Sequence, residues 1–331
     1  MKWLEIRNYE KKFRPLTFFI GGRGIGKTYS SIQYLVERGD LFLYLRNTQT
    51  QIDESCSLMG NPFLRYNQDH GRNIKLVPEK KHFLIVDEVE TPEDEKPVQK
   101  LIGYAAALST FENLRGVDMS DVKYVLFDEF IEKRTLSFNQ FDSFSHMYET
   151  VSRNRELLGE PPLQVFLLSN AQKLDNPILA GYNVMHVIES MIRHGQHDYH
   201  DKALYINLPE SDVSTMKANT ANYQLIHGTK IADEALNNKF AFDSFYGIQR
   251  RNLNEYVPIC QIDGIYIYKH KSGGRLYACH AQAQNIPVFS SRDNRTAFLR
   301  AYGRKLFDAA AKGYLEYSNF VVKSALLEII K

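Results

Sequence analysis

Short apolar runs recur along the first half of the chain, and helical patterns separate several of them. The runs are residues 17–20, 41–45, 124–127 and 165–168. Because polar residues do not alternate within them, they are typical of strands buried on both faces of a parallel sheet. Apolar residues at helical spacing occupy 28–38 and 141–158. This alternation predicts an α/β fold with a mostly parallel sheet.

The middle of the chain departs from this alternation. An apolar run at 81–86 leads into the acidic, proline-bearing run 87–97, which predicts an exposed hairpin or insertion. Residues 209–240 are polar, rich in asparagine and only weakly helical in pattern. We interpret them as a linker or a small helical subdomain.

The last third of the chain has the sequence pattern of β-hairpins. Three runs, 257–262, 265–270 and 275–280, are separated by turn residues, and helical patterns follow at 296–312 and 319–330. A three-stranded meander followed by helices predicts a separate α+β domain. The expected domains are therefore 1–200, a linker subdomain over 201–235, and 236–331.

Composition limits the class of protein and its compartment. The chain has 331 residues, of which 44% are hydrophobic and 12% aromatic. This length and composition predict a folded globular protein of about two domains. No apolar stretch approaches the roughly 18 residues of a membrane span, and the first residues do not form a signal peptide. Cys56, Cys260 and Cys279 have no metal-type spacing, which suits reduced thiols in a cytoplasm. The net charge of +2 means that a nucleic-acid contact needs a local basic surface.

A glycine-rich loop between the first apolar run and the first helical pattern is the clearest chemical motif. Strand, loop and helix are the context in which backbone N–H groups converge on a phosphate. In such a loop Lys27 reaches the β- and γ-phosphates and Thr28 supplies a hydroxyl to Mg²⁺. We therefore expect ATP and Mg²⁺ as ligands. The residues that fit the phosphate-binding pattern G-x-x-x-x-G-K-[ST] are Gly21, Gly22, Arg23, Gly24, Ile25, Gly26, Lys27 and Thr28.

ATP hydrolysis also needs a carboxylate for Mg²⁺ at a strand end, usually beside one that polarises the attacking water. Two apolar runs end in such a pair, Asp87 with Glu88 and Asp128 with Glu129. The first pair continues into a dense acidic cluster, which would repel a nucleotide's phosphates. We therefore assign Asp128 to Mg²⁺ and Glu129 to the catalytic base, and interpret the first pair as a hairpin edge.

Two further candidates lie near the last apolar run. Ser169 and Asn170 end that run, where Asn170 could sense the γ-phosphate or orient the attacking water; they could also simply cap the next turn. Arg153 lies near the end of the preceding helical pattern. It is a candidate arginine finger for a neighbouring subunit, and its alternative is a solvated helix end favoured by the macrodipole.

Four segments together resemble a known family. GGRGIGKT, VLFDEFI, SRNRE and LLSNAQ, in this order, resemble the DNA-packaging motor ATPases of small tailed bacteriophages with protein-primed genomes. The resemblance extends through about residue 177. It implies an ASCE-type ATPase, forming a homo-oligomeric, pentameric ring on the portal of an empty capsid in the host cytoplasm, which drives double-stranded DNA inward. A packaging RNA as a further partner is left open.

The resemblance also implies roles for individual residues. Lys27 and Thr28 fall in Walker A, Asp128 in Walker B and Glu129 at the catalytic glutamate, while Arg153 matches the trans arginine finger. Shortly before the Walker B strand, Arg115 matches another basic residue that points across the subunit interface; its alternative is an ordinary surface arginine.

The C-terminal half resembles the RNase H-like nuclease fold of large terminases, which in this family has lost its cutting site. A nuclease needs several carboxylates for two metal ions, and Asp263 is better explained as the first residue of a tight Asp-Gly turn. We expect DNA or portal contact instead. Candidate phosphate contacts, which are equally explained as solvated charges, are Arg250, Arg251, Lys269, Lys271, Arg275, Arg292 and Arg295.

Three alternatives remain at this point. His194, His197 and His200 have spacing that could bind zinc, although the glycine among them favours a solvated loop. A P-loop switch that binds ATP without translocation would not need Glu129. A terminase-like nuclease would need the carboxylate cluster that the C-terminal strands lack.

Overall fold

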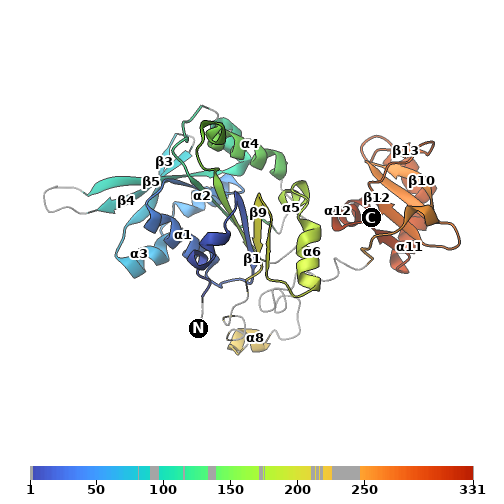
Figure 1. Ribbon diagram of the computed structural model, residues 1–331, viewed down its shortest axis with the longest axis horizontal. Helices are drawn as coiled ribbons and strands as arrows, with labels where there is room; N and C mark the ends of the chain where they lie inside the picture. The colour runs from blue at the N-terminus through green and yellow to red at the C-terminus, as the bar shows by residue number, and fades with distance from the viewer. Residues whose placement is uncertain are drawn as a thin grey trace. The chain divides into compact units, whose positions relative to one another are not determined.

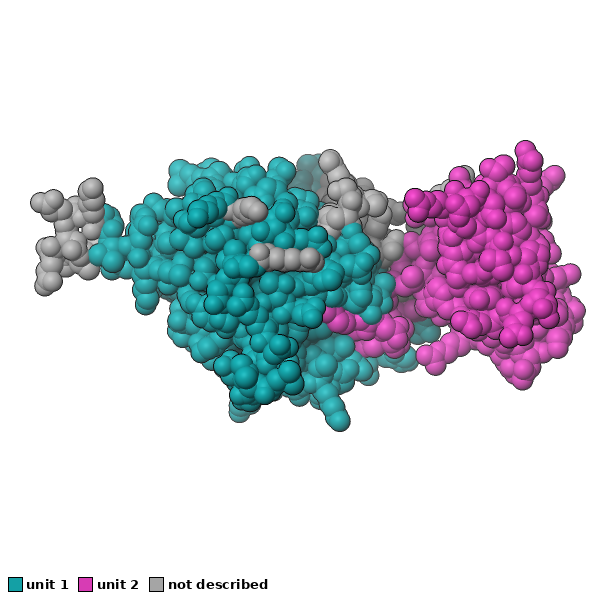
Figure 2. Space-filling view, turned by 90° about the horizontal axis from the view of Figure 1, so that it is seen from above, with its two compact units in different colours: residues 1–181, 190–240 teal, residues 182–189, 241–331 magenta. Residues whose placement is uncertain are grey.

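The computed structural model describes residues 3–80, 82–89, 97–114, 116–132, 139–170, 174, 176–209, 213, 216, 219–225 and 247–330. The chain divides into two compact units, residues 1–181 with 190–240 and residues 182–189 with 241–331 (Figure 2). The expected boundaries at 200 and 235 stay a prediction, because most of residues 210–246 lie outside the described part. None of the described helices is long and apolar enough to cross a membrane.

The first unit is built on a nine-stranded sheet with the strand order β3-β4-β5-β2-β6-β7-β1-β9-β8 (Figure 1). The six strands from β5 to β9 in this order pair in parallel, and β3, β4 and β8 pair antiparallel. The four predicted apolar runs are confirmed as β1, β2, β6 and β7, which are neighbours in the sheet. The strands are β1 (Leu16–Gly21), β2 (Phe42–Arg46), β3 (Ile74–Glu79), β4 (His82–Val89), β5 (Val98–Ala107), β6 (Tyr124–Asp128), β7 (Gln164–Asn170), β8 (Asp198–His200) and β9 (Leu204–Asn207).

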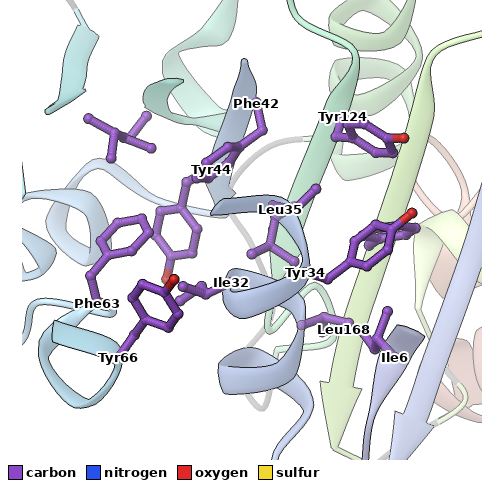
Figure 3. Packing of buried hydrophobic residues seen from close by; sticks show 14 of the residues in the cluster. Ile6, Ile32, Tyr34, Leu35, Phe42, Tyr44, Phe63, Tyr66, Tyr124 and Leu168 are labelled. Atoms are coloured by element: carbon purple, nitrogen blue, oxygen red, sulfur yellow. The ribbon is translucent and has the colours of Figure 1, made fainter. Parts of the chain in front are cut away.

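Helices cover both faces of this sheet. Leu126 belongs to a core cluster that contains Ile32 and Leu35 of α1, and Figure 3 shows these two side chains of α1 among aromatic residues. Successive strand residues point to opposite faces, so the next residue, Phe127, meets the other layer, where its ring stacks on Phe144 of α4 at 5.9 Å. The helices of the unit are η1 (Ile6–Lys12), α1 (Lys27–Arg38), α2 (Gln49–Ser55), α3 (Leu64–His70), η2 (Leu108–Leu114), α4 (Gln140–Ser152), η3 (Arg155–Leu158), α5 (Pro177–Gly181) and α8 (Ala221–Leu225), and α6 (Met185–Arg193) spans the division between the units.

Two predictions for this unit need correction. The helical pattern over 141–158 does not form one helix, because Arg153 and Asn154 adopt left-handed conformations with φ of 43° and 59° and end α4. The hairpin predicted after residue 81 exists, but its second arm, β5, continues into the sheet beside β2. Gly103 permits this pairing, since a Cβ there would lie 2.3 Å from the carbonyl oxygen of Phe42. The sequence did not predict β5 as a strand of this sheet, because its small residues give only a weak hydrophobic pattern.

The second unit contains a five-stranded sheet with the order β13-β10-β11-β12-β14. The predicted meander is confirmed, and Asp263 and Gly264 both have positive φ, as a two-residue hairpin turn requires. The short parallel strands β13 and β14 were not predicted. The elements are η5 (Leu253–Glu255), β10 (Tyr256–Ile262), β11 (Ile265–His270), β12 (Leu276–Cys279), β13 (Val288–Phe289), α10 (Arg295–Phe298), a π-helical turn η6 (Leu299–Gly303), α11 (Arg304–Ala311), β14 (Leu315–Tyr317) and α12 (Phe320–Ile330).

Candidate nucleotide-binding site

The predicted phosphate loop and the second acidic pair meet at one edge of the large sheet. Strands β1, β6 and β7 run parallel side by side, so their carboxyl ends lie together. Gly21 pairs in register with Asn170, and Asp128 with Leu168. A cavity of about 190 Å³ lies at this edge. Its lining consists of Arg23, Gly24, Gly26, Lys27, Thr28, Tyr29, Asp128, Glu129, Ser169 and Asn170.

Glycine is required at two positions of the loop. Gly24 and Gly26 have φ of 71° and 98°, a region that side chains rarely adopt. Gly26 is also the N-cap of α1, so the loop passes directly into the helix. Ile25 is buried between them, and its carbonyl accepts a hydrogen bond from the Leu4 backbone N–H at 2.9 Å. The backbone N–H groups at this helix N-terminus are arranged as an anion-binding site requires.

Lys27 is buried beneath the loop. Its Nζ donates to the carbonyl oxygens of Gly22 at 2.7 Å and Gly21 at 3.2 Å, and to Oδ1 of Asn170 at 3.1 Å. The structure thus joins the predicted lysine to the predicted polar residue at the end of β7. The Lys27 ammonium therefore lies where the loop and the ends of β1 and β7 converge.

Thr28 and Asp128 lie in direct contact. The Thr28 hydroxyl is 3.0 Å and 3.2 Å from the two carboxylate oxygens of Asp128. Burial raises the pKa of the Asp128 carboxyl, and the nearby Arg46 guanidinium opposes that rise. A hydroxyl and a carboxylate are hard oxygen ligands of the kind that Mg²⁺ takes in nucleotide sites, where phosphates and water complete its shell. The side chains present fit that ion.

Glu129 follows Asp128 in a left-handed conformation with φ of 54°. Its Oε2 accepts from Nη2 of Arg46 at 2.7 Å, and Nη1 of the same guanidinium lies 3.6 Å from Asp128. Arg46 ends β2, the strand beside β6. One arginine therefore faces both carboxylates.

Three buried amides hold the backbone after Glu129. Asn47 donates to the Glu129 carbonyl at 3.0 Å, Gln140 donates to the Phe130 carbonyl at 2.6 Å, and Asn176 donates to Gln140 at 2.8 Å. Sequence reasoning missed this network and Arg46. The position of Arg46 and Asn47 in the sequence was the one indication of their role. Both directly follow an apolar run, as Asp128 and Asn170 do in other strands.

Arg153 lies at the opposite edge of the sheet. Its Nη2 donates to the Val117 carbonyl at 3.2 Å and its Nη1 is 3.0 Å from Asp118, both of which precede β6. Asp128 is the last residue of β6, whereas Val117 and Asp118 lie before that strand begins, so the strand separates the two sites. Arg153 is therefore not part of the cavity around its own phosphate loop. Arg115 lies outside the described residues.

The other acidic pair is remote from the loop. Asp87 and Glu88 lie within β4, which pairs with β3 and β5 and is not a sheet edge. Asp87 is buried and accepts from Arg72 Nε at 2.9 Å, and Glu88 is paired with Lys75 at 2.8 Å. The expectation of a hairpin edge is wrong in this detail, because β5 covers the far side of β4. Neither carboxylate lines the cavity.

The remaining candidates are dispersed. Residues 198–200 form β8, so only part of the expected histidine loop is a loop. His194 and His197 contact backbone carbonyls through Nδ1 at 2.8 Å and 3.2 Å, and the described residues contain no group of three potential metal ligands. Three of the proposed phosphate contacts bind within the second unit: Arg251 to Glu316, Arg295 to the Ile329 carbonyl and Lys271 to the Asn254 carbonyl.

Known proteins share both sequence and fold with this chain. A family model described as podovirus DNA encapsidation protein (Gp16) matches residues 5–331. The DNA packaging protein of Bacillus phage B103 is 28% identical over 339 residues, covering 96% of this chain and 97% of the relative. That of Bacillus phage phi29 is 26% identical over 339 residues, covering 96% and 94%.

Solved structures agree with this relationship at the level of fold. A chain of the bacteriophage phi29 viral genome packaging motor assembly matches with a TM-score of 0.64 at 21% identity, covering 99% of both chains. The phi28 gp11 DNA packaging motor matches with a TM-score of 0.61 at 19% identity, covering 99% of this chain and 98% of the other. Because the family model spans nearly the whole sequence, the chain belongs to the podovirus DNA encapsidation protein (Gp16) family.

Proposed function

We propose that this protein is an ATPase motor that moves double-stranded viral DNA into a preformed capsid. The observation that carries the proposal is the contact of Thr28 with Asp128 at 3.0 Å, at the mouth of a loop that also holds Lys27. A nucleotide-binding switch would share these features. Glu129, which lines the same cavity, adds the carboxylate that hydrolysis requires.

Each residue of the cavity has a chemical role in this proposal. The backbone N–H groups of the loop and the Lys27 ammonium bind the β- and γ-phosphates. Thr28 and Asp128 hold Mg²⁺, which neutralises negative charge on the phosphate oxygens. Glu129 orients the attacking water and accepts its proton, and Asn170 contacts the γ-phosphate from the end of β7.

The position of Glu129 implies that hydrolysis is controlled. Its carboxylate is bound by the Arg46 guanidinium at 2.7 Å, and its backbone is fixed by Asn47. This charge-assisted hydrogen bond holds the carboxylate beside the end of β2 and occupies one of its oxygens. Glu129 therefore acts on water only after Arg46 yields at least part of this contact.

The position of Arg153 supports the proposal that identical subunits form a ring. It lies at the far end of β6 from its own phosphate loop, so a role on a γ-phosphate requires a neighbouring molecule. Its left-handed backbone, which is costly for a residue with a side chain, is typical of strained functional positions. We propose a closed homo-oligomer, with five subunits as in the family resemblance, and Arg115 beside the same interface.

DNA and the portal are the proposed macromolecular partners. The support is the family itself and the likeness over the full chain to a protein from the phi29 viral genome packaging motor assembly. A ring docked on the portal in the host cytoplasm can convert each hydrolysis step into movement of DNA through its channel. A packaging RNA would be an additional partner at that vertex.

The C-terminal unit is proposed to be an RNase H-like domain without nuclease activity. Its mixed five-stranded sheet, with a meander and flanking helices, is compatible with that fold. In the described residues no three carboxylate, histidine or cysteine side chains gather as a metal site. Asp263 begins the turn between β10 and β11, and its Oδ1 accepts from the backbone N–H of Ser291, a residue that follows β13, at 3.0 Å.

A substitution of Glu129 tests the proposed function. Glu129→Gln keeps the shape of the side chain but cannot accept the proton, so ATP binding should persist while turnover is lost. The matched control is Glu88→Gln, which changes a carboxylate within β4. With purified empty capsids, wild type should protect DNA from added nuclease in an ATP-dependent manner, and Glu129→Gln should not. Wild-type protection without ATP hydrolysis would contradict the motor.

A further inference from the structure

The turn that ends α4 contains two arginines with different surroundings. The Arg153 side chain is 40% exposed and contacts Val117 and Asp118 at the surface. Arg155, two residues later, is buried, with only 6% of its surface exposed. Burying a charge is costly unless hydrogen bonds replace the water that it loses. Arg155 therefore needs fixed partners inside the protein.

Backbone carbonyl oxygens from two segments of the chain are these partners. The Nε of Arg155 donates to the carbonyl of Ser152 at 3.2 Å, and its Nη2 lies 3.2 Å from the carbonyl oxygen of Val151, both at the end of α4. The same Nη2 lies 2.7 Å from the carbonyl oxygen of Val122 and 3.2 Å from that of Ser120, just before β6. The guanidinium thus joins the end of α4 to the start of β6.

The end of a helix suits a cation that donates hydrogen bonds. The last four carbonyl groups of a helix have no partner within it, and the helix dipole makes this end negative. Arg155 satisfies two of these groups, those of Val151 and Ser152. A planar guanidinium donates in several fixed directions at once, whereas a lysine ammonium is a compact charge on a flexible stem. An arginine at this position can therefore bridge both segments.

The bridge encloses two residues with strained backbone. Arg153 and Asn154 have φ of 43° and 59°, a left-handed conformation that costs energy for residues with side chains. Such conformations persist only where the surrounding structure over-determines them. The side chain of Arg155, which follows the pair, binds the carbonyls of Val151 and Ser152, which precede it. Arg155 therefore closes a loop around Arg153 and Asn154.

We propose that Arg155 is the positioning residue that presents Arg153 to the neighbouring subunit. This inference rests on the proposed function, in which Arg153 acts in trans on a γ-phosphate. Arg155 is buried in its own subunit, so its effect on hydrolysis passes through the place and direction of Arg153. Both guanidiniums bind the segment 117–122. Without Arg155, the turn loses its bonds to that segment and the Arg153 side chain loses its fixed direction.

Turnover by two variants tests this role. Arg155→Met removes the donors at similar side-chain length, and kcat should fall about 10²-fold, the cost of misplacing a catalytic group by about 1 Å. ATP affinity, measured by calorimetry, should stay at the wild-type value, because the contacts of Arg155 precede β6 whereas the phosphate cavity lies at its other end. Arg155→Lys keeps the charge without the fork, so its kcat should be intermediate.

Arg14→Met is the matched control. The Arg14 guanidinium also donates to backbone carbonyls, those of Lys12, Phe13 and Asp201, but it lies beside the start of β1. The substitution removes the same kind of contact from a place that does not touch the turn of Arg153. This variant should hydrolyse ATP at the wild-type rate.

Mixed rings separate positioning from damage to the fold. Arg155→Met subunits mixed with Glu129→Gln subunits should regain activity, because the intact Glu129 of the first meets the intact Arg153 of the second. Arg155→Met mixed with Arg153→Ala should gain nothing over the average of the two, since neither supplies a well-placed finger. If mixed rings form and Glu129→Gln gives no recovery, the defect lies in the subunit's own ATP site and the proposal is overturned.

A double variant compares the two arginines directly. If Arg155 acts through Arg153, Arg153→Ala combined with Arg155→Met should be no slower than Arg153→Ala alone. A further loss as large as that of Arg155→Met by itself would overturn the proposal. If Arg155→Met does not fold, Arg155→Lys takes its place in each comparison.

The same measurements distinguish this proposal from the proposed function. Wild-type kcat in Arg155→Met or Arg155→Lys, with Arg153→Ala slow, would overturn the positioning role and leave the arginine finger in place. Wild-type kcat in Arg153→Ala would refute the finger itself, and the role of Arg155 with it.

Discussion

Arg46 Nη2 and Glu129 Oε2 are 2.7 Å apart, and this ion pair joins the ends of the neighbouring strands β2 and β6. The same guanidinium lies 3.6 Å from Asp128. One cation thus offsets the charge of the proposed metal ligand and of the proposed base. The pair has consequences for pH dependence, stability and turnover.

Removing Arg46 should change the pH dependence of hydrolysis. Its guanidinium lowers the pKa of Asp128 against the raising effect of burial, so Arg46→Ala should raise that pKa further. Because Asp128 must be ionised to hold Mg²⁺, the acidic limb of the kcat/KM profile should move to higher pH. Arg46→Lys, which keeps a positive charge, should move it less. An acidic limb that stays in place in Arg46→Ala would show that Arg46 does not influence Asp128.

Asp128→Asn should abolish Mg²⁺-dependent turnover and yet stabilise the fold at neutral pH. Burial raises the pKa of Asp128 above its ordinary 3.8, so the folded state binds the proton more tightly than the unfolded state. The contribution of Asp128 to the free energy of unfolding therefore falls as the pH rises from 3.8 through the folded-state pKa. This contribution is lowest when the carboxylate is charged. The amide avoids this cost. Thermal unfolding without nucleotide should show a higher Tm for Asp128→Asn than for wild type at pH 7, with the difference shrinking as the pH falls.

Arg153→Ala should bind ATP almost normally and hydrolyse it poorly. An arginine finger supplied in trans contributes about 10³ to 10⁵ in turnover by stabilising charge on the transferring phosphoryl group. Asp118→Asn is the local control, because it removes the ion-pair partner of Arg153 but leaves the guanidinium in place. Its turnover should stay close to that of wild type.

Mixed rings distinguish a trans role from a structural one. Arg153→Ala and Glu129→Gln subunits, mixed together, should regenerate interfaces that pair an intact Glu129 with a neighbour's intact Arg153. The ATPase rate of the mixture should exceed that of either variant alone. If mixed rings form and no mixing ratio restores activity, Arg153 does not act across the interface.

The full-length protein should leave plasmid DNA intact in Mg²⁺ or Mn²⁺. Two-metal nucleases need several gathered carboxylates, and the Asp263 carboxylate is occupied in its turn. The measurement is gel analysis of supercoiled plasmid after prolonged incubation. Cutting that survives repurification and disappears in Asp263→Asn would restore the nuclease alternative.

Local patterns in the sequence were sufficient for several parts of the molecule. The apolar run before Gly21 and the helical pattern after Lys27 predicted the strand, loop and helix around the glycine-rich motif. The Asp263-Gly264 dipeptide identified a hairpin turn, because both residues tolerate positive φ. In each case the residues that determine the structure are close together in the chain, so the signal is contained in a short window.

The tertiary structure decided which distant residues meet. Nothing in the sequence near Leu45 specifies that β2 lies between β5 and β6, so the approach of Arg46 to Glu129 depends on strand order. The break of α4 at Arg153 likewise depends on the packing around it. Strand order and register arise from the collective burial of apolar surface across the sheet. Hydrophobic periodicity within one segment does not indicate which strands lie beside that segment. The sequence alone therefore predicted the glycine-rich loop and the two carboxylates that lie beside it, whereas only the folded chain placed Arg46 next to those carboxylates.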